Sequence, residues 1–192
     1  MQAMTRRKMA AAVAAAALML VSGCTVNQGP PQPSDKTREG VEEGAARTLS
    51  TLHASVPGSQ DLERKATGVL VFPRILAAGL IVGGEHGRGV LRVRGRPDSF
   101  YDITGLSVGW QAGAESKALV IMFLTPAALA KFQASHGWTA GADASVAVVR
   151  DGAHATLDTL SAQNEVVAFA LTNSGLMAAA TIDGTKITPV AM

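Results

Sequence analysis

Short apolar runs separated by glycine fill the chain from residue 69 onward, and they restrict it to a fold built around a β-sheet. Runs of this length that are rich in valine, leucine and isoleucine and end at glycine or polar residues predict β-strands. Residues 118–124 are apolar without a break, which predicts a central strand buried on both faces. The expected strands are 69–72, 79–83, 89–94, 100–113, 117–124, 142–149, 166–171, 176–182 and 186–190.

Three helices are expected beside these strands. The first begins at a cap on Ser34 or Asp35 and runs to about residue 54, because its apolar residues recur every three or four positions. Ser59 caps the second, at 59–66, and the third covers 126–134 with proline in its first turn. The pattern predicts an α+β fold: a curled, mainly antiparallel β-sheet, barrel- or sandwich-like, with N-terminal helices and one helix between strands.

Glycines spaced four residues apart recur in three segments. Residues i and i+4 of a strand share a face, so this spacing predicts stripes of glycine on the sheet. Glycine weakens a strand, and a repeated stripe therefore indicates tight curvature or the close approach of another group. We expect a strongly curled sheet, and the alternative is a groove that admits an extended ligand such as an acyl chain. The groove glycines would be Gly79, Gly83, Gly105, Gly109, Gly137 and Gly141.

The N-terminal segment has the organisation of a secretory signal. Three basic residues, at positions 6–8, precede a short apolar stretch, and small residues follow before Cys24. The segment Val21–Cys24 resembles a bacterial lipobox, in which the chain is cut before a cysteine that receives a diacylglyceryl group. The expected parts are a lipoprotein signal peptide (1–23), the lipidated Cys24 with a flexible tether (24–34), and a single domain (35–192).

Removal of the signal peptide changes the charge of the chain. The full sequence has 17 basic and 15 acidic residues, but three basic and no acidic residues lie in 1–23, which leaves 14 against 15. A slightly acidic mature domain does not have the composition of a nucleic-acid-binding protein. Cys24 is the single cysteine, so no disulfide is expected.

One segment matches a catalytic motif formally. Residues 105–109 read Gly-Leu-Ser-Val-Gly, the G-x-S-x-G pattern of a nucleophile elbow around Ser107, and Asp143 and His154 follow in hydrolase order. An elbow requires a strand before the serine and a helix after it, whereas a strand is expected on both sides here. We therefore expect no enzyme, and a small serine hydrolase that uses Ser107 remains a distant alternative.

No cofactor or metal site is expected. The glycine-rich segment 83–89 lacks the spacing of a phosphate-binding loop and is interpreted as a glycine-rich β-turn. The four histidines are scattered along the chain without the spacing of metal ligands.

Arginines alternate with apolar residues near residue 90. A period of two places such side chains on one face of a strand, and guanidinium groups match the oxygens of phosphate. The alternatives are a binding site for an anionic lipid head group and a solvated or edge-protecting face paired with Asp98, Asp102 or Glu85. The arginines concerned are Arg88, Arg92, Arg94 and Arg96.

Residues from about 50 to 190 resemble the SYLF domain family, in its bacterial lipoprotein branch. The resemblance lies in 66–73 (ATGVLVFP), 78–91 (AGLIVGGEHGRGVL), 93–95, 101–109 (YDITGLSVG), 111–114, 137–143 (GWTAGAD) and 175–177. It implies a lipid-binding domain. Eukaryotic members bind phosphoinositide membranes, partly through a basic helix, and some bind actin. Here the leading helix is slightly acidic and no actin-binding extension precedes it, so we expect membrane lipids as partners, and neither actin nor nucleic acid.

The expected function is that of a non-enzymatic envelope lipoprotein that binds lipid or the membrane surface. The alternative is a periplasmic scaffold or envelope-integrity protein that acts through a protein partner. Thr25 follows Cys24, so the aspartate that retains some lipoproteins at the inner membrane is missing. We therefore expect the protein in the bacterial outer membrane, with its domain facing the periplasm.

Overall fold

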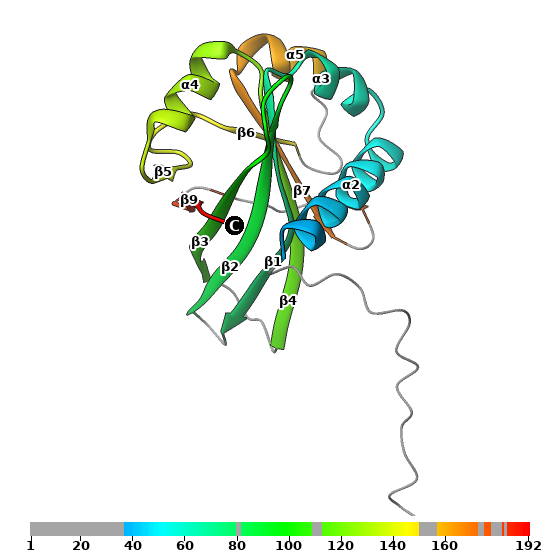
Figure 1. The fold of residues 1–192 in the computed structure, drawn as a ribbon. Helices are drawn as coiled ribbons and strands as arrows, with labels where there is room; N and C mark the ends of the chain where they lie inside the picture. The colour runs from blue at the N-terminus through cyan, green and yellow to red at the C-terminus, as the bar shows by residue number, and fades with distance from the viewer. Residues whose placement is uncertain are drawn as a thin grey trace, which may run out of the picture. The chain divides into compact units, whose positions relative to one another are not determined.

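Nine strands form one curled sheet over the residues that the computed structural model describes, which are 37–79, 82–108, 113–149, 157–172, 175–177, 182 and 184–192. The strand order is β5-β9-β3-β2-β1-β4-β7-β6, with β8 beside β7 (Figure 1). All strand pairs are antiparallel except β6 with β7. The strands are β1 (Gly68–Gly79), β2 (Val82–Val93), β3 (Ser99–Val108), β4 (Gly113–Phe123), β5 (Trp138–Thr139), β6 (Ala147–Val149), β7 (Val166–Thr172), β8 (Gly175–Leu176) and β9 (Lys186–Val190).

Four helices accompany this sheet in the described part of the chain. They are α2 (Arg38–Ser55), α3 (Ser59–Lys65), α4 (Pro126–Ala134) and α5 (Leu157–Gln163). The predicted α+β class, with a curled and mainly antiparallel sheet, is confirmed. The predicted signal peptide (1–23) and the predicted tether with Cys24 (24–34) lie outside the described residues.

The sheet is apolar on both of its faces. In β4, Leu119, Ile121 and Phe123 contribute to one hydrophobic cluster, while Val120 and Met122 contribute to the other. The first cluster includes α4 and β5, and the second includes α2, so we call the two sides the α4 face and the α2 face. The prediction that 118–124 is a central strand buried on both faces is confirmed, because β4 lies between β1 and β7.

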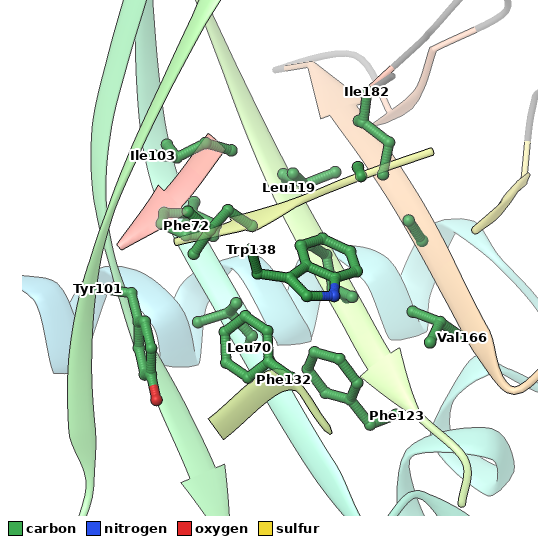
Figure 2. Packing of buried hydrophobic residues seen from close by; sticks show 14 of the residues in the cluster. Leu70, Phe72, Tyr101, Ile103, Leu119, Phe123, Phe132, Trp138, Val166 and Ile182 are labelled. Atoms are coloured by element: carbon green, nitrogen blue, oxygen red, sulfur yellow. The ribbon is translucent and has the colours of Figure 1, made fainter. Parts of the chain in front are cut away.

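Aromatic side chains fill the centre of the α4 face (Figure 2). The Phe132 ring from α4 lies with its centroid 4.8 Å from that of Phe123, 4.9 Å from that of Tyr101 and 5.6 Å from that of Trp138. Tilted and edge-on pairs at these separations are favourable arrangements for aromatic rings. These contacts hold α4 and β5 onto the sheet.

The first two helices begin differently from the prediction. The N-cap of α2 is Thr37, whose Oγ1 accepts a hydrogen bond from the backbone N–H of Gly40 at 3.1 Å, so the expected cap at Ser34 or Asp35 is wrong. Gly58, with φ 83°, is the N-cap of α3. Ser59 is the first helical residue instead, and its hydroxyl donates to the carbonyl oxygen of Val56 at 2.7 Å.

The apolar stripe of α2 packs on the sheet, as its periodicity predicts. Val41, Ala45, Leu49 and Leu52 are all buried in the cluster of the α2 face. The short helix α4 has the predicted bounds. By contrast, α5 is not predicted, because its seven residues include no fully buried side chain and show little periodicity.

The strand β1 carries an irregularity near its middle. The register of β1 with both neighbours shifts around Pro73, so Phe72 and Ile75 point to the same face although they are three residues apart. Proline cannot donate to a strand ladder and is tolerated at such bulges. Gly87 and Gly89 of β2 lie opposite the irregularity. The prediction that residues 83–89 form a glycine-rich β-turn is wrong, because these residues lie within the strand β2.

Several predicted strands have different limits, and three of them differ in how the chain is divided into strands. The segment 79–83 is not a separate strand, because Gly79 ends β1 and pairs with Gly83 near the start of β2. Of 142–149 only Ala147–Val149 is a strand, since residues 141–143 form a turn. The expected strand 100–113 ends as β3 at Val108, and β4 begins at Gly113.

Candidate anionic-ligand groove

The stripe glycines that the structure describes lie in two separate places. Gly79 and Gly83 pair at the joined ends of β1 and β2, and Gly105 of β3 lies near them, where it pairs with Glu85 of β2. Gly137 and Gly141 lie beside β5, where Gly141 has φ 83° in a turn. Gly109 lies outside the described residues. The structure does not bring these glycines together along one groove.

Arg88 is held by an acidic partner on the next strand. Its Nε donates to Asp102 Oδ1 at 2.8 Å and its Nη2 to Asp102 Oδ2 at 3.2 Å, an arrangement that uses the fork of the guanidinium. The hydrogen bond to Asp102 raises the pKa of Arg88 above its ordinary value. Arg88 therefore fits the alternative in which the arginines pair with acidic residues, and Asp102 is one of the partners that the sequence suggested.

Arg92 fastens α2 to the sheet. Its Nη2 donates to the carbonyl oxygen of Glu42 in α2 at 3.1 Å, and its Nε lies 3.7 Å from Asp98 Oδ2. About a third of the Arg92 side chain is exposed. Arg92 therefore has a structural role and also presents part of its guanidinium to solvent.

Arg94 and Arg96 lie beyond the end of the strand. β2 ends at Val93, and a turn follows in which Gly95 has φ 73°, a conformation that favours glycine. Both side chains are exposed, and Arg94 Nη2 donates to the carbonyl oxygen of Arg64 in α3. The expected single stripe is therefore divided between strand residues that pair internally and turn residues that face solvent.

Two adjoining cavities lie on either side of Arg94. One has a volume of about 670 Å³ and the other about 530 Å³, and both are lined by Ala66, Thr67, Val93 and Arg94. We call the two together the arginine groove. Its remaining lining residues are His53, Gln60, Glu63, Arg64, Gly68, Val69, Arg92 and Asp98 in the first cavity, and Arg96, Pro126, Leu129, Ala130 and Gln133 in the second.

The two cavities differ in charge. The first contains three arginines and two carboxylates, and its Glu63 Oε2 lies 2.6 Å from His53 Nε2. The second contains Arg94 and Arg96 and no acidic residue. Its other walls are mostly apolar, with Leu129 of α4 and Val93 of β2 among them. Exposed cations beside an apolar wall suit a ligand with an anionic group and a hydrocarbon segment.

The sequence did not reveal most of this groove. Arg94 and Arg96 were candidates, but Arg64, Leu129 and Pro126 come from helices that are distant along the chain. Their side chains meet the arginines only because α3 and α4 lie at the same end of the sheet as the turn between β2 and β3 (Figure 1).

Part of this domain matches a known protein family. Residues 104–191, from the middle of β3 to the end of β9, match the family model of Ysc84, described as a Las17-binding protein actin regulator. Residues 104–191 belong to the SYLF domain family. The match confirms the family predicted from the sequence. No curated protein matches the chain.

The serine of the elbow-like motif lies within a strand of the SYLF domain. Ser107 pairs with Gly83 of β2, and the next described element after β3 is the strand β4. An elbow would place a helix after the serine. The Oδ2 of Asp143 accepts a hydrogen bond from the backbone N–H of Thr139 at 2.6 Å, and His154 lies outside the described residues. The described geometry gives the hydrolase alternative no support.

The described residues include neither a cluster of metal ligands nor a membrane-spanning helix. Nowhere among them do three His, Cys, Asp or Glu side chains gather as ligands of a metal ion would. Of the helices described, none is long and apolar enough to cross a membrane.

Proposed function

We propose that this SYLF domain binds anionic lipid through the arginine groove, and that the chain is a non-enzymatic bacterial envelope lipoprotein anchored at Cys24. The observation that carries the proposal is the second cavity, in which Arg94 and Arg96 stand beside apolar walls without an acidic neighbour in the lining. A lipid phosphate would lie between the two guanidinium groups, and the adjoining hydrocarbon would contact Val93 and Leu129.

The arginines and the apolar walls contribute differently to the free energy of such binding. A basic residue near an anionic membrane surface contributes about 1 kcal/mol, a factor of about five in affinity. Arg94 and Arg96 are the best placed for this, since both are exposed in the turn after β2. Arg88 contributes less, because Asp102 already neutralises it. Apolar contact with Leu129 adds a term that does not depend on salt.

With the lipid anchor on Cys24, a groove of low affinity would be enough to bind membrane lipid. A diacylglyceryl group on Cys24 would hold the domain at the membrane, and the 13 residues that follow Cys24, up to Thr37, span at most about 45 Å when extended. The groove would then meet lipid at a high effective concentration, so modest affinity in solution is enough for occupancy. We place the domain on the periplasmic side of the outer membrane, because Thr25 follows the anchor.

Liposome cosedimentation tests the groove. We expect Arg94→Gln and Arg96→Gln each to weaken binding to phosphatidylglycerol-containing vesicles about five-fold, and the double variant to weaken it about twenty-five-fold. Arg92 is left intact, because its bonds to Glu42 and Asp98 are structural. Binding should also decline steeply as salt rises.

Arg47→Gln is the matched control for this test. Arg47 is an exposed arginine on α2, paired with Glu43 at 3.5 Å, and it does not line the arginine groove. It removes the same charge and should leave binding almost unchanged. Equal losses in all three single variants would show that net charge alone matters. Absence of binding by the parent chain would favour the alternative of a protein partner.

A further inference from the structure

The sheet narrows to four strands at the end that lies away from the arginine groove. β9 pairs with β3 only over Phe100–Thr104, and β7 pairs with β4 only over Ala118–Phe123. Beyond these points β1, β2, β3 and β4 continue alone, and the ends of β1, β2 and β4 project at the bottom of Figure 1. We call this four-stranded part the distal ribbon. On their outer sides, Gly105–Val108 of β3 and Gly113–Lys117 of β4 pair with no other described strand.

Exposed leucines lie on the α2 face of the distal ribbon. Leu106 of β3 is 82% exposed and Leu76 of β1 is 49% exposed, and these are the large exposed hydrophobic residues of the described chain. The register places Leu106 opposite Gly84, and Leu76 opposite His86. Among the residues described on this part of the face, no lysine, arginine, aspartate or glutamate separates the two leucines.

The two open edges differ in their protection. An exposed strand edge attracts further strands, and proteins commonly block it with charged residues. The β4 edge carries Glu115 and Lys117 in its sequence, and Lys117 Nζ is bonded to Glu85 Oε2 at 2.7 Å. The β3 edge reads Gly-Leu-Ser-Val and has no charge. The β3 edge is therefore the one open to strand addition.

We propose that the β3 edge of the distal ribbon pairs, antiparallel, with the same edge of a second copy of this chain. A two-fold axis perpendicular to the sheet would place Leu106 opposite its counterpart, with both α2 faces on one side of a continuous sheet. An uncharged edge meets its own copy without repulsion, and an isologous pair closes at two subunits. Each Leu106 would be covered by the other.

This dimer is compatible with the arginine groove but does not depend on it. The groove lies at the end of β2 near Val93, whereas the distal ribbon lies at its other end, about 40 Å away along twelve residues. The edge is short, so its interface is smaller than the roughly 800 Å² per partner of a stable complex. We therefore expect dimers on the membrane, where anchored copies are concentrated, and mostly monomers in dilute solution.

Disulfide trapping in membranes tests the geometry. The full chain is expressed with Leu106→Cys or Leu76→Cys, its membrane fraction is oxidised with copper phenanthroline, and dimers are counted on a non-reducing gel. Edge pairing places the two residues 106 in opposed positions, close enough for a disulfide. The two residues 76 would be five strand spacings apart, about 24 Å, so Leu76→Cys is the matched control.

Dimers with Leu106→Cys and none with Leu76→Cys are expected. Dimers with both would indicate that the α2 faces stack on each other, and would overturn edge pairing. Dimers with neither, while a maleimide still labels residue 106, would exclude the contact altogether. The parent chain, with Cys24 alone, gives the background. In a second measurement, dimers are trapped with an amine cross-linker. Leu106→Lys should abolish these dimers, whereas Leu76→Lys should leave their amount unchanged. An unchanged amount of dimer with Leu106→Lys would also contradict the proposal.

Discussion

At the scale of single residues, two glycines of β2 lie where β1 and β2 approach each other closely. A Cβ built on Gly89 would lie 2.5 Å from Phe72 Cδ1 and 2.6 Å from the carbonyl oxygen of Val71. A Cβ on Gly87 would lie 2.5 Å from the carbonyl oxygen of Arg74. The obstacles include backbone atoms, which cannot move without opening the β1–β2 ladder.

We therefore expect Gly89→Ala to destabilise the domain by about 2 kcal/mol, the usual cost of forcing extra volume into a packed site. Gly84→Ala is the control on the same strand, because nothing lies within 4 Å of its Cβ position. Its effect should stay within about 0.5 kcal/mol. Urea unfolding followed by circular dichroism would measure both, and equal stabilities would show that the close approach is not a constraint.

Tyr101 provides a second test at this scale, because it is the single tyrosine of the chain. Its side chain is buried against Phe132, and this burial raises the pKa of its phenol above the ordinary value. Since the folded pKa exceeds the unfolded pKa of about 10, stability is unaffected below pH 10 and falls as the pH rises through the folded pKa.

The near-ultraviolet absorbance of phenolate should therefore titrate later in the native protein than in urea. Tyr101→Phe should remove this one contribution to alkaline unfolding. Coincident titrations of native and unfolded protein would contradict the burial of the Tyr101 hydroxyl.

At the scale of the elements, an ion pair joins two strands that are not neighbours. Glu85 of β2 and Lys117 of β4 meet at 2.7 Å across the intervening β1, and their side chains are 6% and 22% exposed. Gly105 leaves room for the carboxylate, because a Cβ there would lie 2.9 Å from Glu85 Oε1. The pair fixes the relative positions of the strands in the distal ribbon.

Lys117→Met should destabilise the domain by on the order of 3 kcal/mol, because it leaves the buried Glu85 carboxylate without a countercharge. The double variant Glu85→Met/Lys117→Met should recover much of that loss, since two apolar side chains replace the pair without an isolated charge. Thermal unfolding of the parent, single and double variants measures this. A double variant no more stable than Lys117→Met would show that the loss does not come from the unpaired Glu85 carboxylate.

At the scale of the whole molecule, the anchor and the arginine groove have complementary roles in our proposal. The acyl chains would supply residence at the membrane, since two chains hold a protein far more firmly than one. The groove would supply recognition of charged lipid. Neither part requires a spanning helix.

We expect Cys24→Ser to abolish lipidation and leave an uncleaved or mislocalised precursor, because serine has no thiol to accept the diacylglyceryl group. Metabolic labelling with an alkyne palmitate measures the modification, and sucrose-gradient fractionation follows the location. Ser22→Ala, which keeps a small residue before the cysteine, should be labelled like the parent. Equal labelling of the serine variant would refute the anchor.

Elements with local signals could be predicted from the amino-acid sequence. Residues 118–124 are apolar without a break, and β4 is buried on both faces as a result. A helix with proline in its first turn was expected at 126–134, where α4 lies. The family and the fold class followed from motifs and periodicity, because these depend on residues that are close along the chain.

Tertiary structure decided the features that depend on distant partners. The alternation near residue 90 could not show that β2 ends at Val93, nor that Arg88 pairs with Asp102 while Arg94 faces solvent. The glycine spacing of four indicated tight curvature or close approaches, and Gly105 does face Glu85 closely. The approaches to backbone atoms occur at Gly87 and Gly89, opposite the irregularity in β1, and the spacing gave no sign of them. The short strand β5 and the helix α5 gave too little pattern to be predicted. Which side chains meet in the arginine groove was set by packing between α3, α4 and the sheet, and local sequence carries no record of that packing.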